Sequence, residues 1–126
     1  MATAYFRKLG DQFHQNRLYA KLTECRKYSN NYDLFLEIIK DKTDPRSADL
    51  RSYDPRFGEY AMRLVEMVRD SKACAREVLI DDKSELNHQN KSIVELIDSQ
   101  YQEIERSKHP LIISARKVRD RWRKNI

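Results

Sequence analysis

Apolar residues recur every three or four positions along most of this chain, with polar residues between them. This spacing is typical of α-helices that bury one face. It predicts five to six helices within residues 3–28, 32–40, 56–79, 92–105 and 110–126. No convincing period-two alternation of the kind that marks strands interrupts them. We therefore expect an all-α fold, a compact bundle of helices.

Local signals predict where two of these helices begin. Asp54 precedes Pro55, the pattern of an N-cap residue followed by a proline in the first turn. Ser92 and Glu95 match a capping box, in which the two side chains satisfy orphan backbone N–H groups reciprocally.

Two positions favour interruptions of longer helical patterns. Gly10 follows the stripe that begins near Tyr5, and we expect a kink or break there. The pair Asp70 and Ser71 lies in the middle of the third pattern, where a break would give two shorter helices.

The chain length of 126 residues predicts a single helical domain over 1–126. Residues 42–54 are the longest irregular segment, either a plain connector or a functional surface loop. They allow a subdivision into an N-terminal hairpin, 1–41, and a bundle, 54–126.

The C-terminal stretch Pro110–Ile126 predicts an amphipathic helix that closes the bundle. Its apolar residues follow one another in steps of four, three and four, which places them on one face. We expect this face to belong to the core. An exposed indole would contradict both the bundle assignment and the acidic-ligand hypothesis, because both depend on this face. The predicted core residues are Leu111, Ala115, Val118 and Trp122.

The opposite face of this helix is strongly basic. The chain carries a net charge of +5, but residues 106–126 hold eight Lys or Arg and one Asp, so the rest of the chain sums to −2. Three interpretations fit: a solvated face that complements the helix dipole, a docking surface for acidic protein segments, or a contact with nucleic-acid phosphates. The candidate partner-binding residues are Arg116, Lys117, Arg119, Arg121, Arg123 and Lys124.

The composition argues against most site chemistry. With two glycines the chain has neither a P-loop nor a dinucleotide fingerprint, and its three histidines show no metal-ligand spacing. We expect no enzymatic activity, no cofactor, no metal and no small-molecule substrate. No apolar run is long enough to span a membrane, and no membrane partner is expected.

Cys25 and Cys74 show no redox or metal motif. We expect two free thiols that serve as small apolar core residues, which suits a reducing compartment. With no signal-peptide pattern at the start, the nucleus or cytoplasm is the expected location.

The C-terminal third of the chain resembles a known family. His109 and the run Ile113–Lys124, ISARKVRDRWRK, are similar to the closing helix of the N-terminal domain of transcription elongation factor S-II. Elongin A and several Mediator and elongation-complex subunits share that domain. Ser92–Glu105 is similar in placement to the family's penultimate helix.

This resemblance implies a small right-handed helical bundle without catalysis. Such domains bind short disordered motifs, acidic stretches with an aromatic or aliphatic anchor. The resemblance implies that Ala115, Val118 and Trp122 support the core. The cations that would face the acidic flanks of a ligand are Arg119, Arg121, Arg123 and Lys124.

We therefore expect a protein-interaction module for acidic and hydrophobic motifs, in transcription or another nuclear assembly. One alternative is a helical domain that contacts nucleic acid through the basic helix. Another is a structural subunit that self-associates through that helix. The abrupt end after the basic helix favours a piece of a longer protein.

Overall fold

The computed structural model describes the backbone of residues 2–42 and 54–124 and the side chains of 10–40 and 54–124. The regular elements are α1 (Ala2–Arg26), the 3-10 turn η1 (Lys27–Ser29), α2 (Tyr32–Lys42), α3 (Pro55–Leu79), α4 (His88–Glu105) and α5 (Pro110–Lys124). No strand occurs in these ranges, so the all-α class is confirmed. None of the helices described is both long and apolar enough to cross a membrane.

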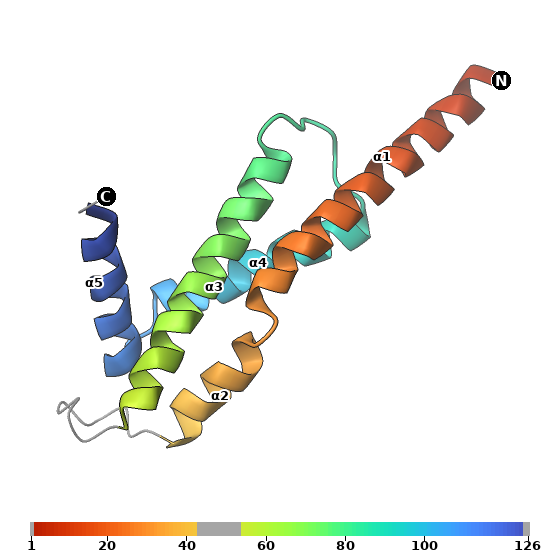
Figure 1. Cartoon of the computed structure of the whole chain (residues 1–126). Helices are drawn as coiled ribbons and strands as arrows, with labels where there is room; N and C mark the ends of the chain where they lie inside the picture. Colours follow the sequence, from red (N-terminus) through yellow and green to blue (C-terminus); the bar gives the residue numbers. More distant parts are fainter. Residues whose placement is uncertain (1, 43–53, 125–126) are drawn as a thin grey trace.

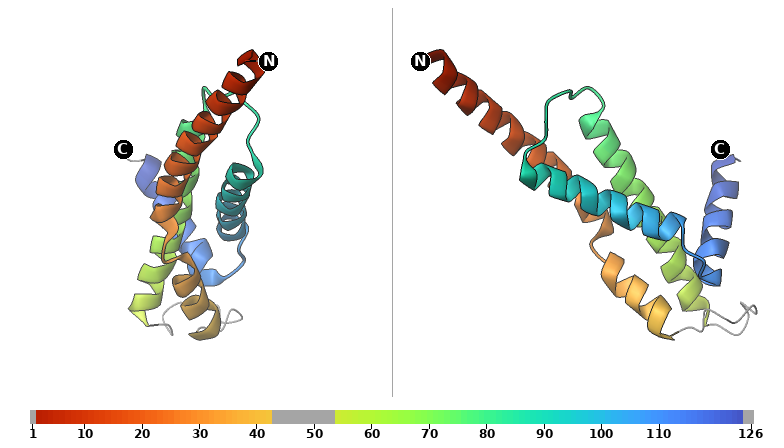
Figure 2. Two further views of the ribbon diagram at one scale, coloured as in Figure 1. Left: turned by 90° about the vertical axis from the view of Figure 1, so that its right-hand side faces the viewer. Right: turned by 180° about the vertical axis from the view of Figure 1, so that it is seen from behind.

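The central element is α3, which packs against α1, η1, α2, α4 and α5. In Figure 1 it runs through the middle of the molecule, with α5 on one side and α1 on the other. The amino-terminal end of α1 extends beyond the other helices in every view (Figures 1 and 2). Helices α2 and α5 join the rest mainly through α3, whereas α1 and α4 also contact each other directly.

The helix start predicted at Asp54 and Pro55 is confirmed. Pro55 opens α3, and the Asp54 carboxylate accepts a hydrogen bond from the Arg56 backbone N–H at 2.9 Å. This bond satisfies one of the donors that a helix start leaves without a partner.

The capping box predicted at Ser92 is wrong, because α4 begins earlier. Asn87 is the N-cap, and its side chain accepts from the Asn90 backbone N–H at 2.9 Å. Ser92 lies inside the helix, where its hydroxyl donates to the His88 carbonyl at 3.0 Å. An asparagine and a serine are both good caps, and the sequence pattern alone favoured the later one.

Neither expected break occurs. Helix α1 is continuous through Gly10, and α3 is continuous through Asp70 and Ser71. Ser71 is buried, and its hydroxyl donates to the Cys25 carbonyl at 2.9 Å, so a tertiary contact satisfies this polar side chain inside the helix. The segment 42–54, on which the subdivision of the chain rests, lies outside the described residues except for its two ends.

The core consists of two clusters along α3. The larger one joins α2, the first half of α3, the end of α4 and the start of α5, with Ile39, Leu64 and Ile112 fully buried in it. The smaller one joins α1, the second half of α3 and α4, around Leu22 and Ile97.

A buried polar layer lies along η1, near the boundary between the two clusters. The Ser29 hydroxyl donates to the Gln100 side chain at 3.2 Å, and the Ser71 hydroxyl lies 3.3 Å from that of Ser29. All three side chains are buried and each has a hydrogen-bond partner, as buried polar groups require. This layer connects η1, α3 and α4 through polar contacts instead of apolar packing.

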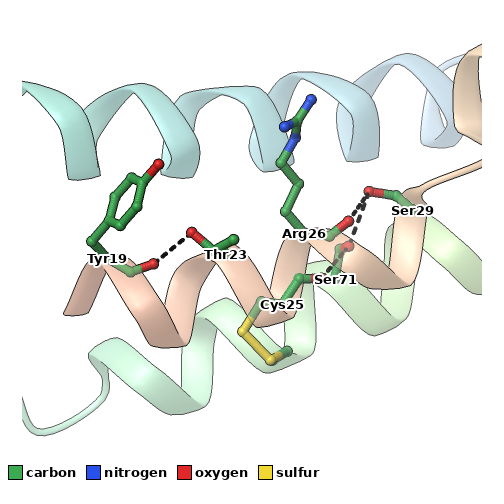
Figure 3. The surroundings of a disulfide bond; sticks show 7 residues. Tyr19, Thr23, Cys25, Arg26, Ser29 and Ser71 are labelled. Atoms are coloured by element: carbon green, nitrogen blue, oxygen red, sulfur yellow. Dashed lines mark hydrogen bonds between the residues drawn. A yellow bond between two sulfur atoms is a disulfide. The ribbon is translucent and has the colours of Figure 1, made fainter. Parts of the chain in front are cut away.

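The expectation of two free thiols is wrong. Cys25 of α1 and Cys74 of α3 form a disulfide, with 5.3 Å between their Cα atoms (Figure 3). The two residues are 49 positions apart in sequence, so no local spacing motif reveals the pair. The disulfide lies in the smaller cluster and fastens α1 to α3.

The predicted core face of α5 is correct at its start and wrong at its end. Leu111 and Ala115 are buried, and Val118 is half-buried. Trp122 is 58% exposed and belongs to no core cluster, so its assignment to the core is wrong. The face is buried at the base of the helix, and α5 diverges from α3 towards its C-terminal end (Figures 1 and 2).

Ile112, which the four-residue stripe omitted, is 1% exposed and anchors α5 instead. We expect Ile112→Ala to lower the free energy of unfolding by about 2–5 kcal/mol, because it leaves a cavity in the larger cluster. Trp122→Ala should change it by less than about 0.5 kcal/mol, as is typical of a surface site. Urea unfolding of both variants checks this, and a larger loss for Trp122→Ala would restore that residue to the core.

The start of α5 depends on an uncharged histidine. His109 Nδ1 accepts a hydrogen bond from the Leu111 backbone N–H at 3.2 Å, so this nitrogen carries no proton. Burial lowers the pKa of the His109 imidazole. The unfolded chain therefore binds a proton at this imidazole more readily than the folded chain does. The neutral imidazole contributes to the stability of the fold above about pH 6.5, the ordinary histidine pKa, and this contribution is lost as the pH falls below that value.

His109→Asn should keep a side-chain acceptor at this cap and remove its titration. Between pH 7 and pH 5 we expect the wild type to lose more of its free energy of unfolding than the variant does. Urea titrations at the two pH values measure the difference. Parallel losses in both proteins would contradict a role for His109 protonation.

Candidate partner-binding groove

Two of the six candidate basic residues are used inside the fold. Arg116 donates to the carbonyl of Ile104 at 2.9 Å and to that of Glu105, at the C-terminal end of α4. Arg119 forms an ion pair with Glu66 of α3 at 2.9 Å. Both are correctly placed on α5, but their side chains join helices and are not free cations for a partner. Carbonyls at a helix end lack internal partners and attract such donors.

The other four candidates are exposed to solvent. By helical spacing Lys117, Arg121 and Lys124 share one face of α5, in steps of four and three. Arg123 lies closer to the side that meets α3. No ion pair joins any of the four to another described side chain. These exposed cations are Lys117, Arg121, Arg123 and Lys124.

The exposed indole of Trp122 lies among these charges. The Arg119 guanidinium carbon lies 5.2 Å from the centre of the Trp122 ring, within the range of a cation–π contact. Because Arg119 also pairs with Glu66, the indole is linked indirectly to α3. A large aromatic side chain held in this way at the surface offers contact area at a small cost in conformational entropy.

A groove separates α3 from α5 beside this tryptophan. A hollow of about 190 Å³ has Val65, Arg69, Trp122 and Arg123 in its lining. It shares lining residues, among them Arg119, with a second hollow of about 550 Å³ along α3, to which Met62 and Met67 contribute. We call these two adjoining hollows the α3–α5 groove.

Arg69 holds the walls of this groove together, and sequence analysis missed it. Its side chain is 9% exposed and binds Glu105 of α4 at 2.7 Å and Asp120 of α5 at 2.9 Å. Hydrogen bonding to Glu105 raises the Arg69 pKa, and Asp120 adds to the effect, so the guanidinium stays charged. The only signal in the sequence was Asp120, the single acidic residue in a basic helix.

Across the part of the chain whose side chains are described, no group of three His, Cys, Asp or Glu residues is placed to hold an ion.

Comparisons with protein-family models, curated proteins and solved structures found no match to this chain. The similarity to the elongation-factor domain therefore stays an expectation from the residues of the C-terminal third.

The Arg69 ion pairs should be a major source of stability at this groove. We expect Arg69→Met to lower the free energy of unfolding by about 2–3 kcal/mol, because it leaves a partly buried Glu105 without its partner. In a double-mutant cycle with Glu105→Gln, the coupling should be about 1 kcal/mol or more. Additive losses, measured by urea unfolding, would show that Arg69 does not depend on Glu105.

Proposed function

We propose that this protein is a non-catalytic interaction module that binds short acidic and hydrophobic motifs of partner proteins at the α3–α5 groove. One observation carries the proposal: Trp122 is 58% exposed beside a hollow and among four exposed cations. The sequence-based hypothesis required a buried indole and is contradicted in that form, because Trp122 is exposed. In the revised form the indole is part of the binding surface, on a bundle that α5 closes.

The apolar part of a ligand has a defined place. An aromatic or aliphatic anchor of the ligand would pack against the Trp122 ring, over the hollow that Val65 helps to line. Aromatic residues in such pockets contribute much of the affinity of protein interfaces. The 190 Å³ hollow is sized for one side chain, which suits a short motif with a single anchor.

The charges favour one orientation of the ligand. Lys117, Arg121 and Lys124 form a basic stripe on the outer side of α5, where acidic residues flanking the anchor would pair with them. On the α3 side, Asp70 is exposed and lines both hollows. Carboxylates of the ligand should therefore lie over α5 and away from Asp70.

Charge reversal on α5 tests this proposal. With a fluorescent peptide that carries one phenylalanine between runs of Asp and Glu, the double variant Arg121→Glu, Lys124→Glu should raise the dissociation constant at least about tenfold. Removing the opposing charge by Asp70→Asn should lower the dissociation constant. Fluorescence anisotropy at two salt concentrations measures both, and added salt should weaken wild-type binding.

A matched control separates the site from net charge. Lys83→Glu, Lys91→Glu reverses two exposed lysines away from α5 and changes the total charge equally. This control should bind the peptide like the wild type. Equal weakening by both double variants, or binding that survives the change on α5, would refute the docking surface.

The nucleic-acid alternative rests on the same exposed residues, because an exposed tryptophan can stack on unpaired bases while the cations contact phosphates. Titration with single-stranded and duplex oligonucleotides at two salt concentrations decides between them. Micromolar binding to an oligonucleotide near physiological salt, with no binding of the acidic peptide, would favour nucleic acid. Concentration-dependent mass in light scattering, abolished by the α5 charge reversal, would instead support self-association through α5.

We assign this module to transcription or another nuclear assembly, as the family resemblance implies. The disulfide argues against that assignment unless the bond is transient, because lasting disulfides are rare in the nucleus and cytoplasm. The nucleus or cytoplasm as its location stays a prediction.

A further inference from the structure

The two sulfurs of the disulfide lie in different surroundings. Cys25 is fully buried among Leu22, Ala75 and Ile97 in the smaller cluster. Cys74 is only half-buried, and it lines a surface hollow of about 640 Å³. The remaining lining of that hollow is Tyr28, Asp70, Ala73, Arg76 and Glu77. A reagent in solvent therefore meets Cys74 before it meets Cys25.

We propose that Cys74 is a thiol–disulfide exchange site at which a dithiol reductant opens the Cys25–Cys74 bond. The attacking thiolate forms a bond to Cys74 Sγ, the bond to Cys25 breaks, and Cys25 Sγ takes the electron pair and then a proton. The second thiol of the reductant, as its thiolate, attacks the mixed disulfide and releases the Cys74 thiolate, which takes up a proton. The protein gains two electrons and two protons, and the reductant leaves as its own disulfide.

The fold confines the effect of this reaction to one end of the molecule. The disulfide fastens α1 to α3 in the smaller cluster, while α2 and α5 belong to the larger one. Opening the bond leaves α1 held by apolar contacts around Leu18 and Leu22 and, nearer its amino-terminal end, by hydrogen bonds of Gln15 to residues 85–90. The larger cluster has no covalent link to lose. Reduction therefore loosens the end of α1 and η1 first.

This loosening reaches the edge of the α3–α5 groove. Tyr28 in η1 lines the 640 Å³ hollow beside Cys74 and also the 550 Å³ hollow beside Arg119. Tyr28, which borders both hollows together with Asp70, thus lies two residues after the end of the helix that the disulfide fastens. The exchange site goes beyond the proposed function, because its chemistry can be measured without any ligand of the groove.

Two single variants test the asymmetry of the cysteines. Cys25→Ser leaves Cys74 as a thiol, and Cys74→Ser leaves Cys25. With iodoacetamide under native conditions, we expect the Cys25→Ser protein to be alkylated at least about tenfold faster, because a buried thiol reacts only through local opening. Mass spectrometry follows the rates, and far-UV circular dichroism confirms that both variants are helical. Equal rates, or faster reaction of Cys25, would overturn the proposal.

A second measurement uses the unchanged protein and does not depend on the variants. After treatment with dithiothreitol, hydrogen exchange should accelerate in Leu18–Ser29 and stay nearly constant in α2 and in residues 111–115 of α5. Reoxidation should restore the slow exchange. Equal acceleration in all helices would show that the disulfide stabilises the whole fold. Unchanged exchange rates at full reduction would show that the bond restrains no helix. Either outcome would contradict a local exchange site.

Discussion

The position of α5, and with it the groove, depends on the ion pairs of Arg69. This one side chain of α3 binds Glu105 of α4 and Asp120 of α5, so it fixes three helices relative to one another. The apolar contacts of α5 with the core are concentrated in its first turns, where Leu111, Ile112 and Ala115 are buried. Beyond them, polar contacts set the angle at which the helix leaves α3. A charge that is nearly buried and paired on two sides resists small displacements of its partners, because separation would leave it unpaired.

The second ion pair on this surface has a different role. Arg119 pairs with Glu66 and lies over the ring of Trp122, so it supports the indole from α3 while the indole stays exposed. Trp122 is therefore exposed on a part of α5 that ion pairs hold against α3. A rigid aromatic surface of this kind suits recognition, because little side-chain entropy is lost when a ligand covers it.

Local patterns predicted the helices well. The features that they did not predict depend on contacts between residues far apart in sequence. Asp54 and Pro55 are adjacent, so their cap could be recognised from sequence alone. The stripe from Leu111 to Trp122 gave the correct face but not the length over which α3 covers it, because periodicity contains no information on where two helices diverge. The ion pairs of Arg69 and the Cys25–Cys74 bond join residues 36 to 51 positions apart, a separation at which one sequence offers no pairing signal. Of the six candidate cations, the sequence could not separate the four that are exposed from Arg116 and Arg119, since all six are arginine or lysine on one helix.

The disulfide also makes part of the chain into a covalent ring. Residues 25–74, which include α2 and most of α3, lie inside this ring, whereas α4 and α5 lie outside it. A protease that cuts once within the ring leaves both fragments attached to each other. A single cut in the short connection between α4 and α5, by contrast, leaves α5 without a covalent link to the rest, held only by its buried residues and ion pairs. Controlled proteolysis at that connection would therefore leave the covalent ring intact, and α5 would stay in place by noncovalent contacts alone.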